Sequence, residues 1–290
     1  MESNSCLVTG GTGFLGRQVV KAFKRAGWKV AATGFTRSGA ANRFPDKCDL
    51  YPEGTRALNV EASRSLAKAS SSRNILLVYI STDYVFAGTE GDAPYEVTDT
   101  PKPSNLYGET KYAGEQAVLV EYKNAGKDGM AVVLRVPVLY GDAESAKESA
   151  VNVLMDAVWK VQEEDVIINM DHWAQNILPT PRMLRVSVKE NPEIAEKYLA
   201  TPDKSSLATI LHFSSEDKFT KYEICQVFAD IMGLSLANVK PNTQGNDLNA
   251  NLQRPYDCHL STKALEGLGI SVHCNDFRGW WRRECRAARR

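Results

Sequence analysis

A glycine-rich segment near the amino terminus limits what this chain can fold into more than any other feature. It reads TGGTGFLG at 9–16, directly after the short apolar run Ser5–Thr9 and at the start of Phe14–Ala26, where apolar residues have helical spacing. A glycine turn between a strand and a helix brings backbone amides and the positive end of the helix dipole to a phosphate. The sequence thus predicts a dinucleotide-binding loop rather than a merely tight turn. The loop residues expected at the cofactor are Gly10, Thr12, Gly13, Phe14, Leu15 and Gly16.

The end of the next predicted strand, Lys29–Thr33, bears on which dinucleotide is bound. An acidic side chain at this place would bind the ribose 2′-hydroxyl of NAD, but the first acidic residue after this strand is Asp46. Arg37 stands here instead, and a guanidinium suits a 2′-phosphate. We therefore expect NADP as the cofactor, with NAD as the alternative. The interpretation without function is a solvated arginine in a loop.

Strand and helix patterns alternate through the first half of the chain. Continuous apolar runs at Asn74–Ser81 and Ala131–Val136 are typical of strands buried on both faces. The spacing predicts a helix over Tyr107–Tyr122 between them. This alternation predicts an α/β fold with a Rossmann-type, doubly wound parallel sheet. We expect a cofactor-binding domain at 1–141 and a smaller mixed lobe at 142–290, partly interleaved with it.

The second half has weaker patterns. Thr220 with Glu223 three residues later predicts a capped helix start, and Ser261 is expected to cap a further helix. The predicted elements are helices at Ser149–Gln162, Glu190–Leu199, Thr220–Met232 and Ser261–Leu268, a short strand at Asp165–Asn169 and a long loop at Asn238–Pro255.

Charge and composition limit which binding partners and which cellular compartment we expect for this chain. The chain carries 35 Lys and Arg against 35 Asp and Glu, whereas a nucleic-acid-binding domain is normally basic. No apolar run reaches the roughly 18 residues of a membrane span, and no secretory leader is recognisable. We therefore expect neither a nucleic-acid nor a membrane partner. Six widely spaced cysteines predict reduced thiols and no metal site. These features favour the cytosol, with the nucleus as the open alternative.

A second group of residues carries acid–base chemistry. Thr82 lies just past a buried strand, where open α/β sheets place their sites. Tyr107 and Lys111 are four residues apart and share a helix face. An ammonium beside a phenol is expected to lower the phenol pKa towards neutrality, so that Tyr107 can act as general acid or base. The bland alternative is a tyrosine and a lysine on the surface.

Together these motifs resemble a known superfamily. TGGTGFLG, STDYVFAGT, YGETK and LRVPVLYG are similar to those of extended short-chain dehydrogenases/reductases, in the dTDP-4-dehydrorhamnose reductase-like branch. The resemblance implies an NADP-binding Rossmann domain with a small C-terminal lobe. It matches Thr82, Tyr107 and Lys111 to the catalytic-type positions, and Arg135 in the LRVPVLYG motif is expected at the cofactor.

Within that branch the chain resembles the family of regulatory β subunits of methionine adenosyltransferase. The similarity includes YISTDYVFAGT, ESAVNVLMD, NMDHWAQNILPT and FTKYEICQVFAD. It implies a non-catalytic protein that binds the catalytic subunit and modulates S-adenosylmethionine synthesis. The alternative is an NADPH-dependent reductase of a nucleotide-sugar ketone. The Arg- and Trp-rich end at 277–290 is expected either to contact the partner or to be a solvated basic helix with packed tryptophans.

One departure from the resemblance concerns the centre of the sheet. The family has a further helix and a central strand between the second strand and the helix that corresponds to Asn59–Ser71. Here the 34–73 segment contains that one helix candidate and no run of four apolar residues. We interpret the gap as one missing strand–helix unit, from a splice form or a faulty gene model. Its loss is expected to weaken both folding and NADP binding.

Overall fold

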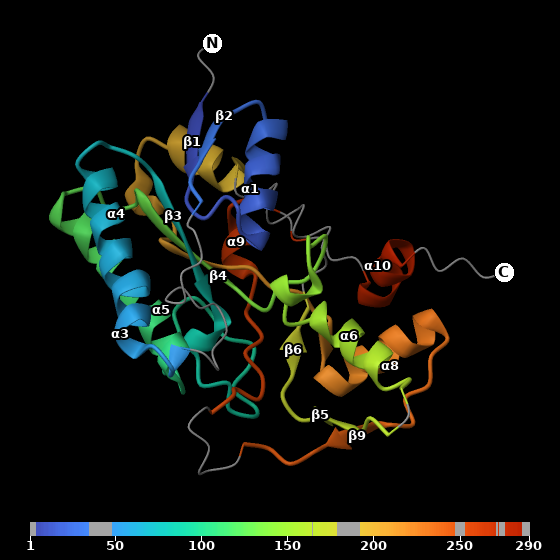
Figure 1. The fold of residues 1–290 in the computed structure, drawn as a ribbon. Helices are drawn as coiled ribbons and strands as arrows, with labels where there is room; N and C mark the ends of the chain where they lie inside the picture. Colours follow the sequence, from blue (N-terminus) through green and yellow to red (C-terminus); the bar gives the residue numbers. More distant parts are fainter. Residues whose placement is uncertain are drawn as a thin grey trace.

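The amino-terminal part forms the predicted strand–helix–strand unit. The computed structural model describes residues 4–34, 48–163, 165–178, 192–246, 253–270, 272 and 276–285. β1 (Ser5–Val8) and β2 (Lys29–Ala32) pair in parallel, and α1 (Phe14–Arg25) connects them (Figure 1). Phe14 and Phe23 of α1 are buried because the apolar residues of this helix lie on one stripe. These elements begin and end within a residue or two of the predicted ranges.

A second parallel sheet lies beside the first. Its order is β3 (Leu77–Thr82), β4 (Ala131–Val136) and β7 (Ile210–His212). Every residue of β4 is buried, as its uninterrupted apolar run predicts for a strand covered on both faces. Because β7 comes from the second half of the chain, the two halves share one sheet. This agrees with the expected interleaving of the two parts. The boundary at 141 stays a prediction.

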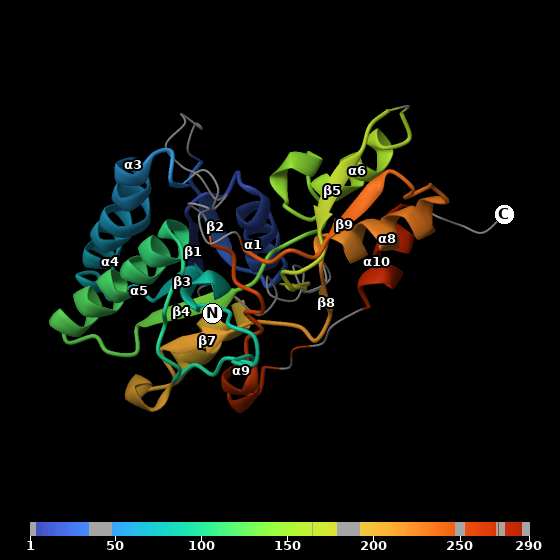
Figure 2. The same cartoon turned by 90° about the horizontal axis from the view of Figure 1, so that it is seen from below.

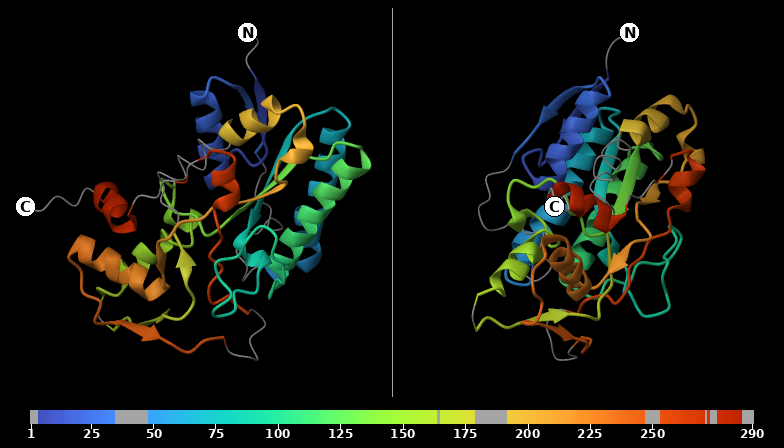
Figure 3. Two further views of the ribbon diagram at one scale, coloured as in Figure 1. Left: turned by 180° about the vertical axis from the view of Figure 1, so that it is seen from behind. Right: turned by 90° about the vertical axis from the view of Figure 1, so that its right-hand side faces the viewer.

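Helices cover both faces of these sheets (Figures 2 and 3). On one face, a helical run precedes β3 and packs on the crossover helix through Ala67, Val118 and Tyr122. On the other face, residues 192–200 and the last part of the chain pack on β4 and β7 through Ile194, Tyr198 and Leu265. The elements are α3 (Pro52–Arg56), the π-helical η1 (Ala57–Ala62), α4 (Ser63–Ser71), α5 (Leu106–Asn124) and α9 (Lys263–Gly267).

The carboxyl-terminal lobe has its own apolar core. Trp281 packs edge-on against Phe228 with ring centroids 4.7 Å apart, and Trp280 contacts Tyr140. Both tryptophans thus pack on the lobe, whereas Arg282 and Arg283 are exposed. The elements are α6 (Val153–Lys160), β5 (Ile168–Asp171), β6 (Asn176–Ile177), β8 (Lys218–Phe219), α8 (Lys221–Met232), β9 (Val239–Asn242) and α10 (Phe277–Glu284). Three single turns complete the list: η2 (Asp83–Val85), η3 (Ala146–Glu148) and η4 (Lys204–Ser206).

Two expectations for this lobe are wrong. The predicted loop Asn238–Pro255 contains β9, which pairs in parallel with β5. Its sequence gives no strand signal because only Val239 is buried and Pro241 lies within it. The cap of α9 is Thr262 rather than Ser261. The capping box of α8 is confirmed: Thr220 accepts from the Glu223 amide, and Glu223 accepts from the Thr220 amide.

The sheet is interrupted between its two parts. Among the strands of the described residues, β1 pairs only with β2, and β3 pairs only with β4. No hydrogen-bonded strand therefore joins the two sheets in the described part of the chain. The missing strand–helix unit stays a prediction, because residues 35–47 lie outside the described part of the chain.

Candidate functional site

The predicted glycine loop has the geometry of an anion site. Gly10 has φ +67°, in the left-handed region, and accepts the amide of Gly13 at 2.9 Å. A Cβ at Gly16 would lie 2.1 Å from the Gly10 carbonyl oxygen, so α1 can approach the turn only with glycine there. The first turn of α1 has no acidic residue, and Gly13 offers no side chain to cap it. The free amides and the dipole therefore favour a phosphate at this end.

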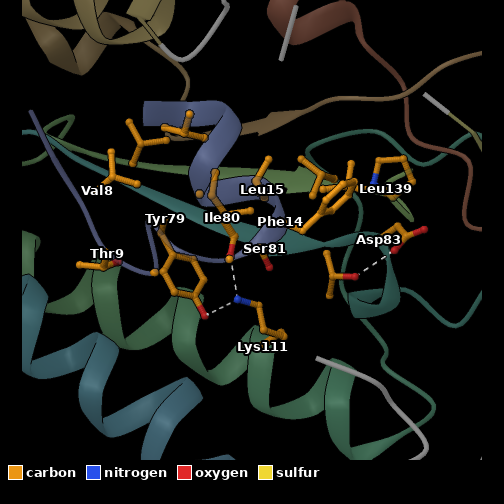
Figure 4. A pocket seen from close by; sticks show the side chains of 18 of the residues that line it. Val8, Thr9, Phe14, Leu15, Tyr79, Ile80, Ser81, Asp83, Lys111 and Leu139 are labelled. Carbon is orange, nitrogen blue, oxygen red and sulfur yellow. Dashed lines mark hydrogen bonds between the residues drawn. The ribbon is translucent and has the colours of Figure 1, made fainter. Parts of the chain in front are cut away.

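The loop opens onto a large cavity of about 990 Å³, at the upper end of the size range of ligand sites. Five of the six predicted loop residues line it, and Thr12 lies in the loop outside the cavity wall. In the view of Figure 4, Phe14 and Leu15 lie above the Lys111 ammonium, and Thr9 lies to the left of it. Thr82, Tyr107 and Lys111 also line this cavity. The structure therefore brings both predicted motifs to one space.

An arginine that the sequence did not single out fixes the glycine loop. Arg17 donates to the Thr12 carbonyl at 2.8 Å and to both oxygens of Glu148 at 3.0 and 2.5 Å. The Glu148 carboxylate also accepts the Glu144 amide. A bidentate guanidinium–carboxylate pair has a defined geometry. The pair connects the loop to the segment after β4. The two residues are 131 positions apart in the chain, so no local sequence pattern predicts their contact.

Lys111 is held by β3 rather than by Tyr107. Its ammonium donates to the Tyr79 hydroxyl at 3.0 Å and to the Ile80 carbonyl at 2.7 Å (Figure 4). The predicted lowering of the Tyr107 pKa is wrong: burial raises that pKa, and the Lys111 charge and the Thr82 side chain offset the rise only in part. Burial also lowers the pKa of Lys111, since it penalises the charged form.

Thr82 is joined by a carboxyl group, Asp83, that is not among the residues predicted from the motifs. The Thr82 hydroxyl donates to Asp83 Oδ1 at 2.9 Å and accepts the Tyr84 amide at 3.2 Å. Burial raises the pKa of Asp83 to about 7, while the bond from Thr82 works in the opposite direction. Asp83 therefore changes charge near neutral pH beside the hydroxyl groups of Thr82 and Tyr107. The sequence feature that could have pointed to Asp83 is its position directly after Thr82, at the end of the strand.

One predicted cofactor residue that the structure describes is not part of this constellation. Arg135 lies 1% exposed in β4, where it donates to both oxygens of Glu115 at 3.0 and 2.7 Å. His212 lies against the same guanidinium at 3.2 Å. The residues that line the cavity do not include Arg135, so its contact with a cofactor stays a prediction. Arg37 lies outside the described residues.

Residues of the second half of the chain also line the cavity. They include Asn176 of β6, Lys221 at the start of α8 and Arg254. His172 does not line it; its Nδ1 is 2.9 Å from the Thr220 hydroxyl, beside the Tyr222 ring. The cavity wall thus combines helix amides, hydroxyl and carboxyl groups, and the cationic side chains Lys111, Lys221 and Arg254. These groups suit a ligand with phosphate and carbonyl groups.

Comparison with known proteins places this architecture in a family. The sequence profile of the RmlD substrate binding domain matches residues 37–280. The structure is similar to a dTDP-4-dehydrorhamnose reductase from Yersinia enterocolitica, with a TM-score of 0.74 and 18% identity, covering 97% of this chain and 98% of that one. The corresponding reductase from Bacillus anthracis, solved in complex with NADP, gives a TM-score of 0.72 at 20% identity, with coverage of 97% and 98%.

The sequence is also similar, along most of its length, to a second group of proteins. Methionine adenosyltransferase 2 subunit beta of Rattus norvegicus is 37% identical over 299 residues, which cover 93% of this chain and 84% of that protein. The chain therefore belongs to the RmlD-like family, together with the methionine adenosyltransferase 2 beta subunits. The fold class and the resemblance predicted from the motifs are confirmed.

Proposed function

We propose that this chain is a regulatory subunit that binds catalytic methionine adenosyltransferase and modulates S-adenosylmethionine synthesis. The observation that carries the proposal is the 37% identity to the rat beta subunit along 93% of the chain. The exposed Arg282 and Arg283 of α10 give the partner a basic surface. No helix in the described ranges is long and apolar enough to cross a bilayer. A cytosolic location remains part of the proposal.

Size-exclusion chromatography tests the partner. The chain is mixed with the catalytic subunit in the presence of NADP, after a thermal melt has established that it folds. Co-elution with a changed rate of S-adenosylmethionine synthesis is the expected result. Arg282→Glu with Arg283→Glu is expected to weaken the complex and leave the melt unchanged. Separate elution of the folded parent chain contradicts the proposal.

We further propose NADP as the ligand of the glycine loop. The residues fit this group: Gly10, Gly13 and Gly16 leave room for a diphosphate at an uncapped helix start without acidic residues. NADP would supply redox chemistry at its nicotinamide ring when bound. Tyr107 and Lys111 would then contact the sugar next to that ring, and Thr82 would orient a carbonyl group beside it.

A glycine substitution with a matched control tests the cofactor. Gly16→Ala places a Cβ against the backbone of Gly10, so NADPH affinity is expected to fall at least tenfold. Gly267→Ala serves as the control, because nothing lies within 4 Å of its added Cβ, and alanine is the better helix former. NADPH and NADH are compared by fluorescence titration. Binding of NADPH to Gly16→Ala with parental affinity would contradict the loop assignment.

A reductase is the second candidate function. It is favoured by the convergence of Thr82, Tyr107 and Lys111 on one cavity. In such an enzyme the Tyr107 hydroxyl would give a proton to the substrate carbonyl oxygen. Tyr107→Phe separates the two functions. A reductase loses NADPH-dependent turnover of a nucleotide-sugar ketone, whereas a regulatory subunit keeps its effect on the catalytic partner.

A further inference from the structure

Tyr79 is a phenol in the candidate site for which the motifs predict no role. It lies in β3, three residues before Thr82, and its side chain is among those that line the cavity. The Lys111 ammonium lies 3.0 Å from its hydroxyl oxygen and 4.3 Å from the centre of its ring (Figure 4). A cation over an aromatic ring is attracted to the face of the ring. Tyr79 therefore holds the lysine through both its hydroxyl and its ring.

The Tyr79 hydroxyl can serve Lys111 only as an acceptor, because an ammonium has three donors and no lone pair. Burial raises the pKa of Tyr79, so the phenol keeps its own hydrogen at neutral pH. That hydrogen also needs an acceptor, and the Asn59 carbonyl accepts it at 3.5 Å. The hydrogen bonds thus run in one direction, from Lys111 to Tyr79 and from Tyr79 to Asn59.

The helices around Tyr79 are shaped to admit its hydroxyl. A Cβ added at Gly114 of α5 would lie 2.4 Å from the Tyr79 hydroxyl and 2.4 Å from the Asn59 carbonyl, so glycine leaves the room for this bond. Asn59 lies in the π-helical turn η1, and its side-chain amide donates to the Thr110 hydroxyl at 3.0 Å. Turns of this kind within helices are frequent at functional sites. Gly114 and the π-helical turn together fix the position of the Tyr79 hydroxyl.

The bonds to β3 also set the direction of the remaining donor of Lys111. Two of its three N–H groups have acceptors, the Tyr79 hydroxyl and the Ile80 carbonyl at 2.7 Å. Since an ammonium is tetrahedral, two fixed bonds determine where the third N–H points. Lys111 lines the cavity, and Tyr107 lies one helical turn before it in α5. The third N–H is therefore the group with which Lys111 can bind a ligand.

We propose that Tyr79 is a positioning residue, whose hydroxyl fixes the Lys111 ammonium for its contact with the ribose of the cofactor. This inference rests on the proposed NADP site, and it names a residue that sets the affinity of that site. Tyr79 acts through Lys111. The competing role is packing alone, because the Tyr79 ring also packs against the apolar cluster that contains Val118 and Tyr122.

Removing the hydroxyl alone separates these roles. Tyr79→Phe keeps the ring and its contact with the ammonium but removes the acceptor. Hydrogen bonds to charged groups are the stronger ones, so NADPH affinity is expected to fall about tenfold in fluorescence titration. Tyr122→Phe is the matched control. That phenol also bonds a carbonyl, that of Ile75 at 2.6 Å, but is not among the residues that line the cavity. Its removal should leave NADPH affinity unchanged, and thermal melts establish that both variants fold.

Nuclear magnetic resonance of the ligand-free chain gives a readout that packing does not move. The signal of an isotope-labelled Lys111 side chain, identified by its loss in Lys111→Arg, reports the deprotonation of the ammonium. Burial lowers the pKa of Lys111, and the neighbouring Tyr107 and Glu115 of α5 oppose that effect. The Tyr79 hydroxyl stabilises the charged form as an acceptor. The Lys111 pKa is therefore expected to fall further in Tyr79→Phe and to stay at its parental value in Tyr122→Phe.

The proposal is overturned if Tyr79→Phe keeps the parental Lys111 pKa, or if it binds NADPH as tightly as the parent chain does. Equal weakening of NADPH binding in Tyr79→Phe and Tyr122→Phe would show an effect of packing and would overturn it as well. If the parent chain binds no NADPH, the proposed cofactor site fails by itself. The resonance titration then decides alone: a lowered Lys111 pKa upholds the positioning of the lysine by Tyr79, and a parental value overturns it.

Discussion

At the scale of single residues, the interior of the sheet depends on a buried ion pair. Arg135 and Glu115 are 1% and 0% exposed and form two hydrogen bonds, and the Arg135 guanidinium also lies 5.1 Å from the Phe86 ring centre. Removing one partner of a buried pair leaves an uncompensated charge. The pair joins α5 to β4, and β4 is the centre of its sheet. Breaking the Arg135–Glu115 pair is therefore expected to lower the stability of the fold.

Glu115→Gln should lower the free energy of unfolding by about 3–5 kcal/mol, because Arg135 would stay charged without its counterion. Urea titration measures the loss. Asp230→Asn is the control: its partner Arg278 is on the surface, and the pair spans 3.0 Å with both side chains exposed. A surface pair contributes less than about 1 kcal/mol. Equal losses in the two variants would contradict the role of burial.

Asp83 should make stability depend on pH in an unusual direction. Burial raises its pKa to about 7, whereas an unfolded aspartate titrates near ~3.9. Its contribution to stability is thus fully present below ~3.9 and is lost as the pH rises through about 7.

Urea titrations at pH values between about 5 and 8 compare the parent with Asp83→Asn, which cannot ionise there. The parent should lose stability relative to the variant as the pH rises. Both proteins keep His212, whose pKa burial lowers to about 4, so the difference isolates Asp83. Parallel pH curves would contradict the assignment.

At the scale of elements, prediction succeeded where the signal is local. The apolar run of β4 gave its bounds, and the Thr220 and Glu223 pair gave the start of α8. β9 was missed because its partner β5 lies some seventy residues earlier and its own side chains are mostly exposed. The features of the candidate site also divide into those with a local sequence signal and those without one. The glycine loop is local, whereas the bonds from Arg17 to Glu148 and from Lys111 to β3 depend on tertiary contacts.

The N-terminal cap of α8 should contribute measurably to the stability of the carboxyl-terminal lobe. Thr220→Ala removes the acceptor of the Glu223 amide and the contact with His172. It is expected to cost about 0.5–2 kcal/mol in chemical denaturation. Thr262→Ala at the start of α9 is the comparison, because that side chain makes no cap hydrogen bond with the helix backbone. A larger loss at Thr262 than at Thr220 would be inconsistent with this ranking.

At the scale of the whole molecule, β7 joins the two halves. It pairs with β4 from Val133 to Arg135, and its residue Leu211 is fully buried. A chain cut after Gly141 loses β7 and α9, so one edge and much of one face of the sheet are uncovered. We expect this fragment to show no cooperative thermal transition by circular dichroism, while the full chain does. A cooperative melt of the fragment would establish 1–141 as an independent domain.

The place of β7 also has a consequence for synthesis on the ribosome. β4 ends at Val136, and its neighbour begins only at Ile210. At about 5–20 residues per second, the edge of β4 waits on the order of ten seconds for its partner to be translated. During that interval a strand of six apolar-rich residues is unprotected. An unpaired apolar strand edge of this kind is open to wrong pairing and aggregation, and slow codons between the two strands would lengthen that exposure.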